Sequence, residues 1–131
     1  MLTKLEGFLR GQISKAGAKD AVEIVMLQDQ GETVVGIKRN VLLDKAQGKF
    51  CAFVDDDDWV SDTYVPDILS AIRTYDDLDC VGFFGDVLFQ GKHAGIMIHS
   101  TLCPCWTEKA GMYYRPPNHL NPIRADIARS V

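Results

Sequence analysis

Apolar residues recur at spacings of three and four in three stretches of the chain, the period of a helix that buries one face. The stretches are residues 2–16, 37–46 and 63–74. Gly17 and Gly48 follow the first two stretches and can end them, because glycine readily adopts the conformation found after helices. Ser61 or Asp62 can cap the third. The pattern therefore predicts three amphipathic helices.

Other apolar runs lack the helical period and are rich in valine, isoleucine and phenylalanine, which favours strands. These runs are residues 21–29, 49–54, 78–89 and 95–100. A turn at residues 90–92 separates the last two, and residues 101–121 are expected to be irregular. A final helix is predicted to begin with Asn121 as its cap and Pro122 at its first position.

Helices and strands thus alternate along the chain, which is typical of an open, mostly parallel sheet covered by helices. We predict an α/β fold and one domain over residues 1–131. Ligands of such sheets bind beyond the carboxyl ends of the strands. Two acidic positions fall at such ends, namely Asp29 after the first predicted strand and Asp55–Asp58 after the second.

Composition narrows the classes of function. The formal net charge of −4 argues against a nucleic-acid partner, which would need a basic surface. No apolar run approaches the roughly 20 residues of a membrane span, so no transmembrane segment is predicted. Cys51 and Cys80 lie inside apolar runs, where a reduced thiol packs as a small hydrophobic group. We therefore expect a cytoplasmic protein without disulfides.

Four consecutive carboxylates, Asp55 to Asp58, follow directly on the apolar run Phe50 to Val54. In an extended chain alternate side chains share a face, so Asp55 and Asp57 would point together. Such a pair suits a hard divalent cation such as Mg²⁺ or Mn²⁺, which prefers oxygen ligands and often also binds substrate phosphates. The alternative is a solvated acidic turn that caps the following helix.

The segment GIKRNVLLDKAQGKFCAFVDDDDWVSDTYVPDIL resembles the signature of family 2 glycosyltransferases. In that family an Arg-Asn pair opens a helix, Ala-x-Gly closes it, and an apolar strand runs into a DxD-type motif. Arg39–Asn40, Ala46–Gly48 and Asp55–Asp58 occur in that order, and the similarity covers roughly residues 20–75. The resemblance implies the three-layer GT-A fold and a metal-dependent, inverting transfer from a nucleotide-sugar donor to a carbohydrate or other hydroxyl acceptor.

The resemblance also implies roles for individual residues. Asp29 would accept hydrogen bonds from the base of the donor, expected to be uracil of a UDP-sugar, and Arg39 would lie near the nucleotide. Asp55 would face the ribose or the metal, Mn²⁺ or Mg²⁺, and Asp57 would be the principal metal ligand. Asp56 and Asp58 would support the sugar or the shell of the metal.

Each of these positions also has a simpler interpretation. Asp29 could be an acid in the turn that ends its strand, and Arg39 could pair with Asp44 on the helix surface. His119 would contact the donor phosphate or the acceptor, or be an ordinary loop histidine. Trp59 would stack on a sugar or base, or pack under the helix.

Two parts of the family pattern are not found. The family opens with a strand that carries a nucleotide loop, whereas this sequence opens on the predicted helix. The family places its catalytic base in a Glu-Asp pair after a segment like PPNHLNPIRADIARSV, and no Glu-Asp pair occurs here. We therefore expect a glycosyltransferase domain truncated at both ends, with its base beyond Val131. The alternative is an inactive fragment that binds nucleotide-sugar.

Histidine and cysteine side chains near the C-terminal part offer a different metal chemistry. The candidates for zinc are His99, Cys103, Cys105 and His119. Only one residue separates the two cysteines, whereas structural zinc motifs favour two to four. The spacing therefore favours a proline-containing loop with reduced thiols over a zinc site.

Overall fold

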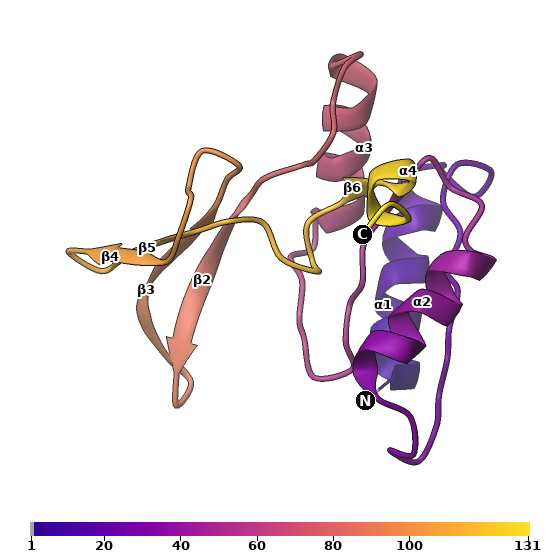
Figure 1. The fold of residues 1–131 in the computed structure, drawn as a ribbon, viewed down its shortest axis with the longest axis horizontal. Coiled ribbons are helices and arrows are strands. Elements are labelled where there is room, and N and C mark those ends of the chain that lie inside the picture. The colour runs from indigo at the N-terminus through magenta and orange to yellow at the C-terminus, as the bar shows by residue number, and fades with distance from the viewer. Residues whose placement is uncertain (1) are drawn as a thin grey trace.

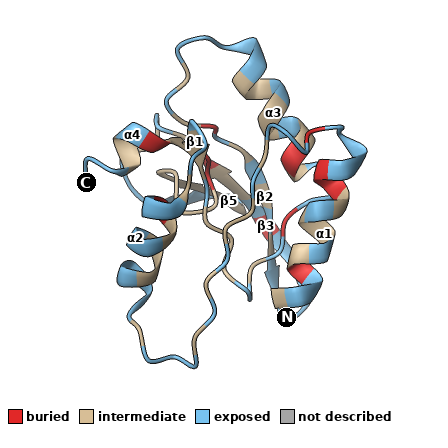
Figure 2. Ribbon diagram, turned by 90° about the vertical axis from the view of Figure 1, so that its right-hand side faces the viewer, coloured by how far each residue is buried: buried red, intermediate tan, exposed pale blue. Residues whose placement is uncertain are grey.

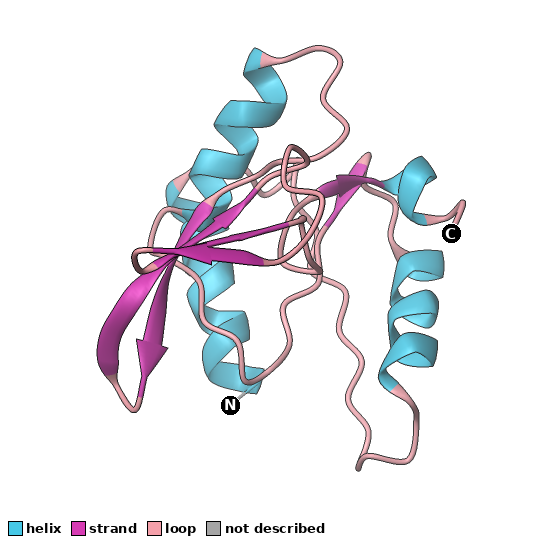
Figure 3. Cartoon of the chain, turned by 60° about the vertical axis from the view of Figure 1, so that its left-hand side comes forward, coloured by secondary structure: helices cyan, strands magenta, loops and turns pink. Residues whose placement is uncertain are grey.

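Helices dominate the N-terminal part of the chain and short strands the C-terminal part (Figures 1 and 3). A computed structural model describes residues 2–131. The helices are α1 (Leu2–Lys15), α2 (Val35–Lys45), α3 (Tyr64–Thr74) and α4 (Ala125–Ala128). The strands are β1 (Phe50–Cys51), β2 (Phe84–Phe89), β3 (Lys92–His99), β4 (Thr107–Lys109), β5 (Met112–Arg115) and β6 (Ile123–Arg124).

The three predicted helices are confirmed, with ends within two residues of those expected, although α2 buries only Leu43 of its predicted stripe. α1 and α3 pack together around Ile13, Ala18 and Val65, whose side chains are buried. Figure 2 shows several of the buried residues where α1 faces the start of α3. The apolar stripes of α1 and α3 therefore meet in this contact.

The start of α3 is capped from a distance. Neither Ser61 nor Asp62 caps it, because the residue before the helix is Thr63 and its side chain makes no capping hydrogen bond. Instead the buried amide of Gln12 on α1 accepts a hydrogen bond from Val65 N and donates one to Ser61 O, at 2.9 and 2.8 Å. The local capping prediction was wrong because a tertiary contact supplies the acceptor.

The predicted first strand, residues 21–29, is not a strand in the structure. The segment is extended and half-buried on alternate residues, but no backbone hydrogen bond joins Glu23–Asp29 to another part of residues 2–131. A strand is defined by such a ladder, and a β-rich composition cannot supply the partner. Glu23 ties the segment to the rest of the fold by accepting hydrogen bonds from Gln47 N and Gly48 N.

The second predicted strand is shorter than expected and is paired differently. β1 covers two residues and runs antiparallel to β6, with Phe50 opposite Arg124 and Cys51 opposite Ile123. Ile123 is bridged on its other side by Cys80, again antiparallel. β3 and β5 form the one parallel pair among the strands of residues 2–131, so the mostly parallel order is not present there, whereas the α/β class is.

A second, four-stranded sheet has the order β2-β3-β5-β4 and projects away from α1 and α2 (Figure 1). The predicted strand over residues 78–89 begins only at Phe84, and the region expected to be irregular contains β4 and β5. Gly95 is required where β3 meets the β4–β5 turn, because a Cβ there would lie 2.3 Å from Gly111 O.

The C-terminal segment also differs from the expectation. Pro122 precedes the short strand β6 instead of opening a helix, and α4 begins only after Arg124. Asn121 is not a helix cap, because its buried side chain donates to Val81 O and accepts from Asn118 N, both at 2.9 Å. This amide fastens the loop before β6 to the segment before β2.

Candidate functional site

The four consecutive aspartates form a tight turn at the end of β1. Asp58 N donates to Asp55 O at 3.0 Å, and Asp55 N donates to the carboxylate Oδ2 of Asp58 at 3.2 Å. Asp55 and Asp58 are therefore neighbours at the base of the turn and are half-buried, whereas Asp56 and Asp57 are exposed at its tip. The turn changes the pairing expected from an extended chain, in which Asp55 and Asp57 would have shared a face.

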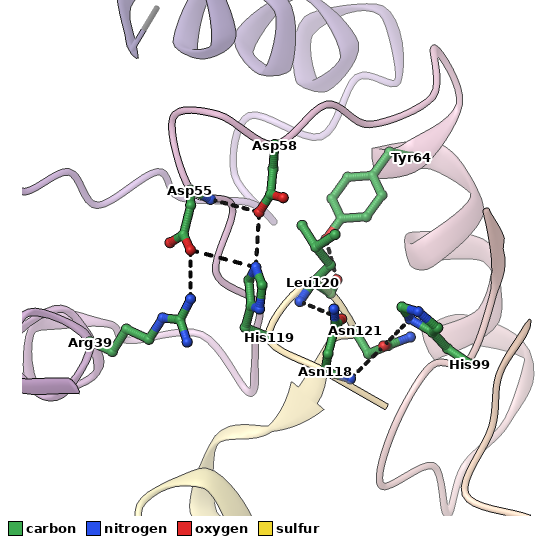
Figure 4. A network of polar contacts seen from close by, with 9 residues as sticks. All are labelled: Arg39, Asp55, Asp58, Tyr64, His99, Asn118, His119, Leu120 and Asn121. Carbon is green, nitrogen blue, oxygen red and sulfur yellow. Dashed lines mark hydrogen bonds and ion pairs between the residues drawn. The ribbon is translucent and has the colours of Figure 1, made fainter. Parts of the chain in front are cut away.

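His119 comes to the base of this turn from the loop before β6 (Figure 4). The loop lies beside the extension of β1 because Phe53 N donates to His119 O at 2.8 Å. The imidazole Nε2 then lies 2.9 Å from Asp58 Oδ2 and 3.6 Å from Asp55 Oδ2. His119 is thus part of the acidic site, although 61 residues separate it from Asp58.

Arg39 reaches the same site from α2. Its Nη2 donates to Asp55 Oδ2 at 2.7 Å, and its guanidinium lies over the ring of Phe53, 5.6 Å from the ring centroid. The sequence also allowed a pair with Asp44, but the ion pair formed is with Asp55. Arg39 Nε is buried without a hydrogen-bond partner within residues 2–131, so one donor beside the acids is unsatisfied.

Asp29 is held by the residue next to Arg39. Lys38 Nζ lies 3.0 Å from Asp29 Oδ1, and the carboxylate also accepts hydrogen bonds from Gly31 N and Thr33 N. The lysine, followed by these N–H groups, lowers the pKa of Asp29 to about 2. Adjacent basic residues of α2 thus connect the two acidic positions predicted at strand ends, and Asp29 also fits the alternative of a turn acid.

Three side chains present atoms suited to a metal ion. One carboxylate oxygen each from Asp55 and Asp58 and a ring nitrogen of His119 all lie within 4.8 Å of one another. Asp57 is outside this group, so its role as principal ligand remains a prediction. The sequence analysis did not single out Asp58 as a ligand, although an i, i+3 pair within a turn is the signal that could have indicated it.

The two histidines and two cysteines considered for zinc do not form a common group of ligands. Among residues 2–131 the acid–acid–histidine group is the one set of three or more possible ligands. His99 is instead buried with its Nδ1 2.7 Å from Asn121 Oδ1. Because that oxygen also accepts from Asn118 N, His99 Nδ1 is the donor. Burial lowers the pKa of His99, which keeps the ring neutral.

Trp59, directly after the acids, packs against α1. Its ring stacks on Phe8 with centroids 4.8 Å apart, and Lys4 Nζ lies 5.4 Å from the ring. This contact matches the packing alternative, although 58% of the residue remains exposed. Trp59 therefore helps to hold the acidic turn on the helix.

The side chains of the site are half-buried, with 26% of His119 and 41% of Asp55 accessible. Two hollows elsewhere have volumes of about 750 and 390 Å³; the larger lies beside α1 and the smaller beside α4. Neither is lined by the aspartates of the turn, Arg39 or His119. The chemistry of the acidic turn therefore depends on the charges and donors gathered there.

Comparison with known proteins identifies the family. The family described as "Glycosyl transferase family 2" matches residues 14–121, which is most of the chain. This chain belongs to glycosyl transferase family 2. The matched range contains Asp29, Arg39, the acidic turn and His119. No curated protein and no solved structure gave a match.

Membership establishes the class of fold and of reaction. The domain is of the GT-A type, and the α/β arrangement with small mixed sheets agrees with this. Glycosyl transfer from a nucleotide-sugar to an acceptor is the reaction of the family, so this is a glycosyltransferase domain. No helix within residues 2–131 is long and apolar enough to cross a membrane.

Proposed function

We propose that this glycosyltransferase binds a UDP-sugar together with a divalent cation at Asp55, Asp58 and His119. The observation that supports the proposal is the convergence of three possible ligand atoms within 4.8 Å. Two carboxylates with one nearby guanidinium leave a net negative site, which favours a cation. A cation would supply positive charge that stabilises the leaving diphosphate.

The ligand types favour manganese over magnesium. Carboxylate oxygens suit both ions, but magnesium demands near-ideal octahedral oxygen coordination. The imidazole nitrogen of His119 is a softer ligand and makes the set better suited to Mn²⁺. His119 must present Nε2 without its proton to coordinate a metal.

Arg39 is suited to a phosphate group of the donor. Its Nη2 is occupied by Asp55, but its buried Nε has no acceptor within residues 2–131. A phosphate oxygen would satisfy this donor with a charge-assisted hydrogen bond. Arg39 would thereby hold the carboxylate of Asp55 and the diphosphate of the donor next to each other.

The remaining predicted residues extend the donor site. Asp29, ionised at neutral pH, would accept hydrogen bonds from the uracil base. Asp56 is exposed at the tip of the turn, where it could contact the sugar, and Asp57 beside it is the alternative metal ligand. Lys38 holds Asp29 and Arg39 holds Asp55. Because the two basic residues are adjacent on α2, they would fix the position of the base contact relative to the phosphate contact.

Transfer would proceed as a single displacement that inverts the anomeric carbon. An acceptor hydroxyl, from a carbohydrate or another alcohol, attacks as the diphosphate leaves, and a base removes the hydroxyl proton. No base is assigned within this chain, and the family's Glu-Asp pair does not occur in its sequence. The alternative function is donor binding without transfer.

Calorimetry with UDP, with and without Mn²⁺, tests the site. We expect Mn²⁺ to strengthen UDP binding, and Asp58→Asn and His119→Ala to weaken that binding by more than about tenfold. Asp57→Asn distinguishes the two ligand sets, and Asp62→Asn is the control because it removes a nearby exposed acid. UDP binding that is indifferent to both the metal and Asp58 would overturn the proposal.

Turnover of a labelled UDP-sugar then separates the two functions. Release of UDP or transfer to added alcohols supports the enzyme, whereas metal-dependent binding without either supports the binding protein. Asp29→Asn should weaken uridine nucleotides more than it weakens inorganic diphosphate, since only the former carry the base. Equal losses for both ligands would contradict the contact between Asp29 and uracil.

A further inference from the structure

One face of the four-stranded sheet is apolar in its centre and charged at its two edges. Cross-strand partners place four side chains in one row, which contains Asp86, Ile96, Met112 and Lys109 from β2, β3, β5 and β4. Two residues along each strand, the next row on the same face contains Phe84, Ile98, Tyr114 and Thr107. We call these eight side chains the open face.

One end of the opposite face contacts α3. Phe83 and His99 lie on that opposite side, since side chains alternate along a strand. Phe83 contacts Tyr64 of α3, with ring centroids 6.0 Å apart. On the open face Phe84 is 74% exposed and Ile96 is 36% exposed. An exposed apolar patch of this kind marks a candidate interaction site.

We propose that the open face binds a second copy of this chain. The two sheets would pack face to face about a two-fold axis parallel to the strands, between β3 and β5. This axis places β2 of each copy over β4 of the other. The dimer therefore contains two equivalent ion pairs, each between Asp86 of one copy and Lys109 of the other. Ile96 would lie over the partner's Met112, and Ile98 over the partner's Tyr114.

The charges select both the occupant and the axis. A two-fold axis lying across the strands along the first row would place each aspartate over an aspartate and each lysine over a lysine, which is repulsive. Rotation about an axis parallel to the strands instead places the aspartate edge of each row over the lysine edge of the other, which is attractive. Asp86 is open to such a contact, being 74% exposed although His93 Nε2 lies 3.3 Å away.

The size of the face sets the strength of association. Four strands spaced about 4.8 Å apart give a sheet roughly 20 Å wide. With its two rows of side chains about 7 Å apart along the strands, the face covers roughly 300 Å², which is less than the roughly 800 Å² per partner of a standard interface, so the dimer should form only at high protein concentration. Low-salt buffer should strengthen it, because the two ion pairs lie at the rim.

Sedimentation equilibrium of the 131-residue chain over about a hundredfold range of concentration tests the dimer. We expect a reversible monomer–dimer equilibrium. Asp86→Lys and Lys109→Asp, each alone, should raise the dissociation constant by about tenfold, because each places like charges opposite one another. The double variant restores opposite charges and should return the dissociation constant to near that of the parent chain.

Lys92→Asp is the matched control, because it reverses an exposed charge at the start of β3, outside the open face. Circular dichroism checks that each variant is folded. A chain that remains monomeric throughout, or a dimer in which the double variant is no better than the single ones, overturns the proposal. Dimerisation that Ile96→Glu leaves unchanged also overturns it, since another surface would then be responsible. These outcomes are independent of UDP binding.

Discussion

The contact between Lys38 and Asp29 determines how this acid responds to pH. Its pKa is lowered from the ordinary 3.8 to about 2, so the folded chain binds the proton less well than the unfolded chain. The ionised carboxylate therefore contributes stability at every pH above 3.8, and that contribution is lost as the pH falls through about 2.

Replacing Lys38 by glutamine should move the pKa of Asp29 back toward 3.8, since the lysine is the largest cause of the shift. Carboxylate chemical shifts followed by NMR during an acid titration measure the change directly. Lys45→Gln, which removes an exposed charge near the end of the same helix, should leave the titration of Asp29 unaltered. An Asp29 that titrates alike in both variants would show that the lysine does not cause the shift.

Asn121 is the most heavily used buried polar side chain in the described fold. It is 2% exposed and its amide satisfies Val81 O, Asn118 N and His99 Nδ1. Replacement by alanine leaves these three groups without partners, and we expect a loss of about 2 to 3 kcal/mol in the free energy of unfolding. Urea denaturation measures this loss. The exposed Asn40→Ala should cost little or nothing, and equal losses would refute the role of the network.

At the scale of elements, Gln12 joins two helices through one amide. Its oxygen accepts from Val65 N in the first turn of α3, where helices have N–H groups without internal partners. Gln12→Ala should therefore destabilise the protein by about 1 to 2 kcal/mol, comparable with loss of a helix cap. Hydrogen exchange should report faster exchange at the start of α3 than at its end. The exposed Gln28→Ala is the control, and an unaffected Val65 amide would contradict the capping role.

The site itself is assembled by three elements that meet. The turn after β1 supplies the acids, α2 supplies Arg39, and the loop before β6 supplies His119. The pairing of β1 with β6 fixes the last of these, because it brings the loop beside Phe53. Changes that disturb the short β1–β6 ladder should therefore weaken the proposed binding of a metal, even though they replace none of the three converging side chains.

At the scale of the whole molecule, the apolar core is small and one extended segment has no ladder partner. Eight apolar side chains are buried within residues 2–131, and the backbone of Glu23–Asp29 has no hydrogen bond to another segment there. Stability should accordingly be uneven, with the α1–α3 contact opening last and the extended segment opening most readily.

Native-state hydrogen exchange tests this distribution. We expect amides of residues 23–28 to exchange with little protection, and amides around Ile13 in α1 to approach the protection of global unfolding. Addition of UDP and Mn²⁺ should extend protection to the acidic turn. Strong protection of residues 23–28 in the monomer would show that this segment has partners other than those seen in the structure.

The sequence by itself determined the helices, because an apolar stripe is a local pattern. The stripes of α1 and α3 are buried against each other, whereas α2 buries only Leu43. The sequence also located Asp29, Arg39 and the Asp55–Asp58 run, since a motif is a matter of residue type and spacing. The family assignment, made on these residues, was confirmed by the match over residues 14–121.

Only the tertiary structure decided which strands pair and which acids converge. Strand pairing needs a partner from elsewhere in the chain, so β-rich residues 21–29 could not reveal that they lack one. The turn at Asp55–Asp58 brings the first and last acids together, and the distant His119 joins them through a backbone hydrogen bond to Phe53. Contacts between residues far apart in sequence leave no periodic trace in it, which is why the ligand group emerged from the fold alone.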